Sequence, residues 1–283
     1  MSQTRTILIT GATGKQGGAI AAELSGAGFS LRAMTRKPDG AAARALAARG
    51  IAVVPGDLDD EASVRSALAG VWGAYSVQNT WEAGVEREEA QGKRFAKLAK
   101  EAGVHHLVYS SVGSADRQTG IPHFENKWRV EETIRELEFP SHVILRPVFF
   151  MENLVSPGFL SGDKLVSALN PGTVLQMIAV RDIGKYGARA FTDAERLNRR
   201  EIDIAGDALT LPDAASQLGR ALGRPLEYQP IPMADVRKHS EDLALMLEWF
   251  ERTGYDVDIP ALEGEFGIPP TRFAAWAASQ RGA

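Results

Sequence analysis

Three glycines near the N-terminus are spaced so that the backbone between them can hold a phosphate group. Gly11, Gly14 and Gly17 form a G-x-x-G-x-x-G pattern between the apolar run Thr6–Ile9 and a helical pattern. In such a turn the first glycine takes an unusual φ, the second lets the backbone approach a pyrophosphate, and the third lets helix and strand pack closely. The helix N-terminus adds unpaired N–H groups and a partial positive charge. The pattern favours a dinucleotide-binding loop over a purely structural turn. The loop residues expected at the cofactor are Gly11, Thr13, Gly14, Lys15, Gln16 and Gly17.

The end of the second apolar run indicates which dinucleotide is bound. Proteins that take NAD usually carry an Asp or Glu about 20 residues after the glycines, where it binds the ribose. Residues 33–37 read AMTRK and contain no carboxylate. Arg36, with Lys37 beside it and Lys15 in the loop, can instead hold a 2′-phosphate by charge-assisted hydrogen bonds. These residues predict NADP(H) as the cofactor, and a solvated basic turn is the alternative.

Polar residues follow the third apolar run. Asp57, with Leu58 after it, is expected at the adenine, where the carboxylate accepts a hydrogen bond from the amino group. Its alternative role is to cap the next helix, which Asp59 or Asp60 can do equally well.

Polar and aromatic residues also follow the fourth run. The carboxyl ends of parallel strands face the cofactor crevice, so Gln78 and Asn79 are predicted to touch the ribose or the nicotinamide. Trp81 either covers a flat substrate or packs under its loop.

Residues 1–150 alternate between short apolar runs and helical patterns. The expected strands cover residues 6–9, 29–34, 51–54, 71–77, 106–110 and 142–145. The expected helices cover residues 19–24, 41–49, 60–69, 85–102 and 124–137. Short apolar runs separated by helices imply a parallel sheet that is covered on both faces, and right-handed crossovers make it doubly wound. The predicted fold class is therefore α/β, with a Rossmann-type doubly wound parallel sheet.

The remainder of the chain loses this alternation. Proline and glycine interrupt residues 157–172, so a loop-rich stretch is expected there. Further strands are predicted at residues 201–204 and 226–229, and further helices at residues 183–192, 212–222, 233–252 and 271–279. We expect a dinucleotide-binding Rossmann domain over residues 1–153, to which residues 179–205 return. Residues 154–283 are expected to form mainly a smaller C-terminal α+β lobe for a substrate or a partner.

Composition excludes several classes of function. The 283 residues include no cysteine, so disulfides, thiolate metal sites and cysteine nucleophiles are excluded. A formal net charge of −4 argues against a broad nucleic-acid surface. The sequence has no H-E-x-x-H pattern, and no metal site is predicted. It has no leader-like pattern and no apolar stretch of about 18 residues, so a cytoplasmic protein without a membrane span is expected.

Several of these segments resemble the NmrA-like branch of the extended and atypical short-chain dehydrogenase/reductases. The glycine loop is similar to the cofactor loop of that superfamily. The branch is indicated by Thr35-Arg36, Gly56-Asp57-Leu58, the RPVFFMEN segment over residues 146–153, AVRDIG over residues 179–184, and Ala205-Gly206-Asp207 with Leu209-Thr210. The resemblance covers nearly the whole chain. It implies a Rossmann lobe, a small C-terminal lobe and an NADP(H) pocket between them. Pro147 and Phe149 are expected beside the cofactor, with plain core packing as the alternative.

The resemblance also implies where catalytic residues would lie, and one of them differs. Short-chain dehydrogenases use a Ser, a Tyr and a Lys, with the last two spaced Y-x-x-x-K on one helix face. Ser111 and Lys127 match two of these positions, but His123 stands at the tyrosine position. His123 can act as a surrogate acid, because histidine ordinarily titrates near neutrality. Alternatively a quinone takes its proton from water, or the site only binds NADP(H) and Lys127 serves the ribose. An ordinary histidine at a helix start is the remaining interpretation.

Two functions are compatible with these residues. One is an NADPH-dependent oxidoreductase that acts on a quinone or another flat conjugated acceptor. The other is a sensor of the NADPH/NADP ratio that acts through a protein partner. The resemblance covers both, since NmrA-like proteins include regulators and quinone reductases. The expected partner is correspondingly a small-molecule acceptor or a protein, with no direct binding to nucleic acid.

Overall fold

The computed structural model describes residues 4–281, which form two compact units. The first unit contains the chain up to Asp116, residues 123–146 and residues 183–202. The second contains residues 117–122, residues 147–182 and the chain from Asp203. The chain therefore crosses between the units several times. No helix in the described part of the chain is long and apolar enough to span a membrane.

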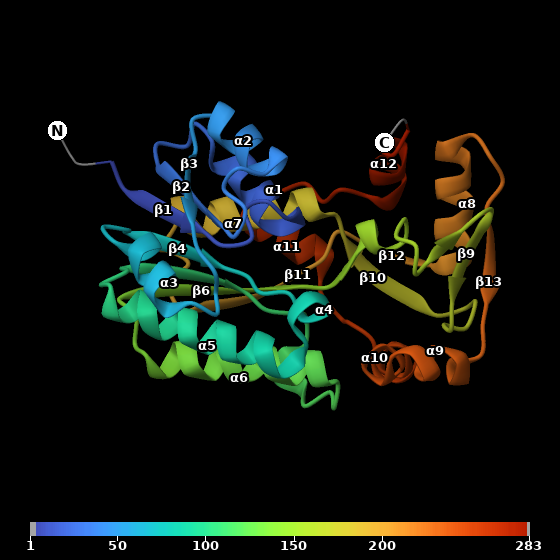
Figure 1. Ribbon diagram of the computed structural model, residues 1–283. Helices are drawn as coiled ribbons and strands as arrows, with labels where there is room; N and C mark the ends of the chain where they lie inside the picture. The colour runs from blue at the N-terminus through green and yellow to red at the C-terminus, as the bar shows by residue number, and fades with distance from the viewer. Residues whose placement is uncertain (1–3, 282–283) are drawn as a thin grey trace. The chain divides into compact units, whose positions relative to one another are not determined.

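The first unit is built on a seven-stranded sheet, as counted over residues 4–281 (Figure 1). Its strands are β1 (Thr6–Ile9), β2 (Ser30–Thr35), β3 (Ala52–Pro55), β4 (Gly73–Ser76), β5 (His106–Ser110), β6 (Ser141–Pro147) and β11 (Arg200–Ile204). Their order is β11-β6-β5-β4-β1-β2-β3, and β1 to β6 pair in parallel. This is the predicted doubly wound Rossmann sheet. Its order reverses between β1 and β4, which is where such sheets bind their ligands.

Helices cover both faces of this sheet. They are α1 (Lys15–Leu24), α2 (Ala41–Ala48), α3 (Glu61–Leu68), α4 (Thr80–Ala83), α5 (Val85–Glu101), α6 (Pro122–Glu136) and α7 (Val180–Thr192). Figure 1 shows α3, α5 and α6 on one face and α1, α2 and α7 on the other. Apolar residues of α3, α5 and α6 form one buried cluster with strand residues such as Leu8 and Leu107. Every strand of the sheet's centre is buried on both faces, which explains its continuous apolar runs.

The second unit contains two small sheets. Its strands are β7 (Phe149–Phe150), β8 (Leu160–Ser161), β9 (Lys164–Ser167), β10 (Val174–Ile178), β12 (Asp207–Thr210) and β13 (Glu227–Pro230). They are ordered β12-β10-β7 and β13-β9-β8. The helices are α8 (Leu211–Leu222), α9 (Met233–His239), α10 (Glu241–Arg252), α11 (Ile259–Phe266) and α12 (Phe273–Ala278). This unit is the smaller α+β region that the sequence predicts.

One local expectation in the second unit is wrong. The single helix expected over residues 233–252 is two helices, because Ser240 takes an extended backbone between α9 and α10. Its Oγ accepts a hydrogen bond from the Leu243 N–H at 3.1 Å, so Ser240 caps α10. Residues 157–172, expected to be loop-rich, are mostly loop and contain the short antiparallel pair β8 and β9.

Candidate functional site

The glycine loop joins β1 to α1 and has the geometry of a phosphate cradle. Gly11 has φ of +60°, and its carbonyl accepts a hydrogen bond from the Gly14 N–H at 2.8 Å. A Cβ on Gly17 would lie 2.5 Å from the Gly11 carbonyl carbon and oxygen, so no other residue fits there without a backbone shift. Gly14 is the N-cap of α1 and has no side chain with which to cap that helix end. The cradle therefore fits a pyrophosphate at the helix N-terminus.

Hydrogen bonds fix the strand ends beneath this loop. Thr10 Oγ1 donates to the Val77 carbonyl at 3.1 Å and accepts from the Val77 N–H at 2.8 Å. Gln16 Oε1 accepts from Ser110 Oγ at 2.7 Å and from the Tyr75 hydroxyl at 3.2 Å. These bonds tie the carboxyl ends of β1, β4 and β5 to the first turn of α1. They also give the Gln16 side chain a structural role within the loop.

The residues predicted to hold the adenosine end lie after β2 and β3. Arg36 is exposed directly after β2, and its Nη2 forms an ion pair with Glu82 Oε1 of α4. Asp57 Oδ1 accepts a hydrogen bond from the Asp59 N–H at 3.0 Å, which closes the turn. Asp60, and not Asp57, caps α3 by accepting from the Ala62 N–H at 3.0 Å. The capping alternative for Asp57 is therefore wrong, and its adenine contact stays a prediction.

Lys127 is paired with a carboxylate that the sequence did not reveal. Its Nζ lies 2.6 Å from Glu88 Oε1 of α5, and the two side chains are only 12% and 2% exposed. Asn126 Nδ2 donates to Glu88 Oε2 at 2.8 Å, and Thr80 Oγ1 also hydrogen-bonds to it. Burial opposes ionisation of Glu88, but Lys127 and these donors hold the pKa of its carboxyl below the usual value. The lysine is thereby held in place on α6.

The histidine at the tyrosine position lies beside an exposed tryptophan. The His123 side chain is nearly buried, and its ring centroid is 5.5 Å from that of Trp81 and 4.8 Å from that of Phe124. Trp81 is 65% exposed, so it does not pack under its loop. Ser111 follows β5, is buried, and its N–H donates to the Leu145 carbonyl at 2.7 Å. His123 and Lys127 lie in the first two turns of α6, and Ser111 directly follows β5.

Neither tyrosine on the neighbouring strands substitutes for the missing phenol. Tyr75 and Tyr109 are fully buried in β4 and β5. Burial raises the pKa of both hydroxyls above their ordinary value of about 10. A phenol with a raised pKa holds its proton more firmly, and neither hydroxyl reaches solvent.

Gln78 and Asn79 differ in their surroundings. Gln78 is buried, and its Nε2 donates to Ser76 Oγ at 3.0 Å. Its Oε1 has no hydrogen-bond partner within residues 4–281. Asn79 is exposed and caps α4, because its Oδ1 accepts from the Trp81 N–H at 3.2 Å. Asn79 therefore positions Trp81 and Glu82, and a direct cofactor contact for either polar residue stays a prediction.

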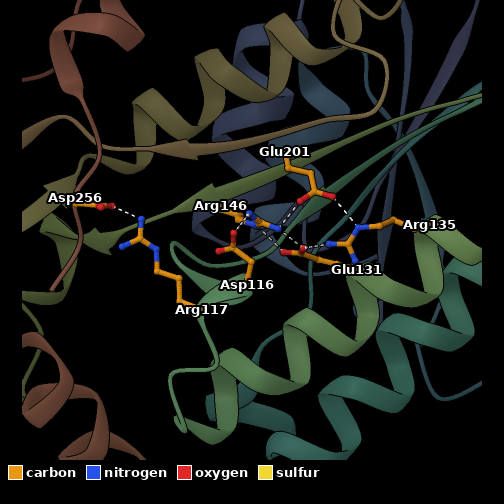
Figure 2. Close-up of polar contacts among 7 residues, drawn as sticks. All are labelled: Asp116, Arg117, Glu131, Arg135, Arg146, Glu201 and Asp256. Carbon is orange, nitrogen blue, oxygen red and sulfur yellow. Dashed lines mark hydrogen bonds and ion pairs between the residues drawn. The ribbon is translucent and has the colours of Figure 1, made fainter. Parts of the chain in front are cut away.

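A buried ion network fixes α6, which carries His123 and Lys127 (Figure 2). Arg146 of β6 donates through Nε and Nη2 to the two carboxylate oxygens of Glu131 at 2.9 and 2.6 Å. Its Nη2 also contacts Glu201 of β11 at 2.5 Å, and Arg135 bridges both glutamates at 2.8 and 2.7 Å. Burial disfavours the charge on Arg146, but Glu131 and the other carboxylates raise the pKa of its guanidinium overall. The arginine that begins the RPVFFMEN segment is thus a structural anchor.

Two predicted residues belong to the second unit. Pro147 is the last residue of β6, and Phe149 begins β7, where it pairs with Met177 of β10. The Phe149 ring is 5.5 Å from that of Phe159 and 6.2 Å from that of Phe250, centroid to centroid. Phe149 thus has the packed surroundings of a core residue within its own unit, and its cofactor contact stays a prediction.

Comparison with known proteins identifies the family. The profile of the NmrA-like family matches residues 3–272. This chain belongs to the NmrA-like family. It is 29% identical to a (4-alkanoyl-5-oxo-2,5-dihydrofuran-3-yl)methyl phosphate reductase of Streptomyces griseus, over 96% of each chain. It is 30% identical to an NAD(P)H azoreductase of Xenophilus azovorans, over 82% of this chain and 79% of that one.

A solved structure agrees with this assignment. The NADPH-dependent quinone oxidoreductase QOR2 of Escherichia coli, in complex with NADPH, superposes with a TM-score of 0.82 at 26% identity. The match covers 96% of this chain and 99% of that one. The family to which this chain belongs thus includes NAD(P)-binding, Rossmann-type oxidoreductases. No cluster of acidic and histidine side chains suited to a metal ion occurs among the residues that the structure describes.

Two residues of this region were not foreseen from the sequence. Glu88 and Glu82 lie on α5 and α4, where they pair with Lys127 and Arg36. Each pair joins positions 39 and 46 residues apart in the chain, so no local pattern connects them. Asn79, an N-cap residue type, marks the start of α4 but does not indicate either ion pair.

Proposed function

We propose that this protein is an NADPH-dependent oxidoreductase that reduces a flat, conjugated acceptor. The observation that carries the proposal is the glycine cradle at the carboxyl end of β1, with Arg36 at the end of β2. Gly11, Gly14 and Gly17 would hold the pyrophosphate, and Arg36 with Lys37 would hold the 2′-phosphate. When bound, NADPH supplies a hydride to the acceptor, and the acceptor also gains one proton.

The choice of acceptor is supported by the residues near α6. His123 replaces the tyrosine that would deliver a proton. Tyr75 and Tyr109 do not take over this role, because burial raises the pKa of both hydroxyls and keeps them away from solvent. A conjugated acceptor such as a quinone, an azo compound or an enone can take its proton from water after the hydride has arrived. The exposed Trp81 beside His123 offers an aromatic surface on which a flat acceptor can stack. The named activities of the azoreductase, the quinone oxidoreductase and the dihydrofuran reductase all concern such compounds.

Cofactor titration tests the first half of the proposal. The affinities of NADPH and NADH are measured by calorimetry on the wild type and on Arg36→Ala. Losing a charge-assisted hydrogen bond costs roughly 1.5 to 3 kcal/mol, so NADPH should bind about 10- to 150-fold more weakly to the variant. NADH should be little affected. Arg49→Ala removes the same charge at the end of α2 and serves as the control. An equal loss for both cofactors contradicts the 2′-phosphate role.

A turnover assay tests the second half. NADPH oxidation is followed by absorbance with quinones, azo dyes and enones, beside a control without protein. We expect saturable turnover, a raised KM for the acceptor in Trp81→Leu, and turnover that persists in His123→Asn. If His123→Asn abolishes turnover while NADPH still binds, the histidine is the acid and the proton does not come from water. If NADPH binds but no acceptor is reduced, the oxidoreductase proposal fails and a sensor of the cofactor ratio takes its place.

A further inference from the structure

The arginine expected at the 2′-phosphate already has an anionic partner. Arg36 Nη2 forms an ion pair with Oε1 of Glu82, which lies 46 residues further along the chain. The two side chains are 57% and 53% exposed, so both reach solvent. The contact joins the end of β2 to α4, the short helix that follows β4. A carboxylate is thus held against the group that would select NADPH.

We infer that Glu82 is a specificity-determining residue that competes with the 2′-phosphate of NADPH for Arg36. This inference rests on the proposed role of Arg36. A guanidinium binds carboxylate and phosphate through the same planar fork of N–H donors. A phosphate monoester carries a charge of about −1.5 to −2 near pH 7, so it repels a carboxylate that stays on the same guanidinium. NADPH must therefore displace Glu82 or bind beside it at a cost. NADH has no 2′-phosphate and meets no such conflict.

The structure of α4 makes this exchange a local one. Asn79 caps the helix at its start, and Gly84, with φ of +81°, ends it. Thr80 is tied to Glu88 of α5 by a hydrogen bond through its hydroxyl. These bonds hold the helix backbone, while the Glu82 side chain extends into solvent. A change of side-chain rotamer is then sufficient to release Arg36, and the rest of the site stays in place.

Glu82 should therefore reduce the preference of the protein for NADPH over NADH. Exposed ion pairs contribute little, so removing Glu82 should tighten NADPH binding by about two- to fivefold. NADH binding should not change. The affinities for NADPH and NADH would therefore differ less in this protein than in one whose Arg36 has no neighbouring carboxylate.

The test is a titration of NADPH and NADH on Glu82→Gln. Glu86→Gln is the control, because it removes the same charge from an exposed position on the adjacent helix. We expect tighter NADPH binding in Glu82→Gln, unchanged NADH binding, and no comparable change in Glu86→Gln. Unchanged NADPH affinity in Glu82→Gln, or an equal change for both cofactors, overturns the inference.

A double-mutant cycle with Arg36→Ala separates competition from simple charge repulsion. If Glu82 acts through Arg36, Glu82→Gln should have no effect on NADPH affinity in the Arg36→Ala background. An effect that persists there means that Glu82 repels the phosphate directly, and the inference of competition fails. The cycle also distinguishes the two proposals. A loss in Arg36→Ala that is equal for both cofactors refutes the 2′-phosphate subsite itself, whereas an NADPH-specific loss with an inert Glu82 refutes only the competition.

Discussion

Arg146→Met is the most informative change to the scaffold of the site. Arg146 and Glu131 are 4% and 0% exposed, and their bidentate pair sits among Arg135, Glu201 and Asp116 (Figure 2). The substitution keeps the apolar volume but removes one of two guanidiniums that face three carboxylates. Breaking a buried pair costs roughly 3 to 5 kcal/mol, because the remaining charge is left in a poor solvent. Arg135 still bonds to Glu131 at 2.8 Å, so we expect the lower end, about 3 kcal/mol.

The assay is equilibrium urea denaturation followed by tryptophan fluorescence. Trp128 reports on the network itself, because the Arg135 guanidinium lies 4.2 Å above its ring. Arg146→Met combined with Glu131→Gln should recover most of the loss, because it leaves no uncompensated buried charge.

The matched control is Arg117→Met. Arg117 pairs with Asp256 in the second unit, where the two side chains are 40% and 66% exposed. An exposed pair contributes less than about 1 kcal/mol, so this variant should be nearly as stable as the wild type. The reasoning is refuted if Arg146→Met costs no more than Arg117→Met, or if the double variant is as unstable as Arg146→Met alone.

Three further predictions concern the first unit. Burial lowers the pKa of His106 to about 4, so the unfolded chain binds this proton more readily than the folded chain does. The free energy of unfolding should therefore fall by about 3 kcal/mol as the pH drops from 6.5 through 4. His106→Gln should flatten this pH dependence of unfolding, whereas the control His239→Gln, at an exposed position, should leave it intact. Gly17→Ala should lower the free energy of unfolding by about 1 to 3 kcal/mol and weaken NADPH binding, because the new Cβ would lie 2.5 Å from the Gly11 backbone. Gly18→Ala should be tolerated, because its Cβ would lie 3.4 Å from the nearest backbone oxygen. Equal effects of the two variants in melting and titration experiments contradict this prediction. Lys127→Met should destabilise the fold, because Glu88 is left buried without its cation. Combining Lys127→Met with Glu88→Gln should restore stability but not the affinity for NADPH. Full recovery of NADPH binding in that double variant means that Lys127 does not touch the cofactor.

The sheet was predictable because its signals are local. Each central strand is an apolar run bounded by turn residues, and each crossover helix has its own periodicity. The glycine loop was also predictable, because its three glycines follow a fixed spacing. The structure explains the last of them, since a Cβ on Gly17 would collide with Gly11. The fold class followed from these features, whereas the family was indicated by the resemblance of other segments, such as residues 146–153.

The second unit was harder to predict because its signals are short. β7 and β8 have two residues each, which is too few for a periodic pattern. The break between α9 and α10 was missed although Ser240, followed by Glu241 and Asp242, is an N-cap with an acidic first turn. A continuous helical pattern over residues 233–252 concealed that signal.

The charged pairs of the candidate site lay beyond prediction from one sequence. Glu88 and Glu82 come from elements that the fold brings against Lys127 and Arg36, and nothing in their own neighbourhoods marks them. The sequence did identify the cationic halves of both pairs. It could not show that each cation already has a carboxylate partner, because that depends on how α4, α5 and α6 pack.

The proposed reaction moves a hydride from NADPH to a conjugated acceptor. The most direct test uses NADPH that carries deuterium at C4 of the nicotinamide, prepared separately as each of the two stereoisomers. An enone is the acceptor, because a C–D bond formed at carbon does not exchange with water. We expect the product to gain one deuterium from one stereoisomer and none from the other. A product that contains no deuterium from either, or equal label from both, contradicts an enzymatic hydride transfer.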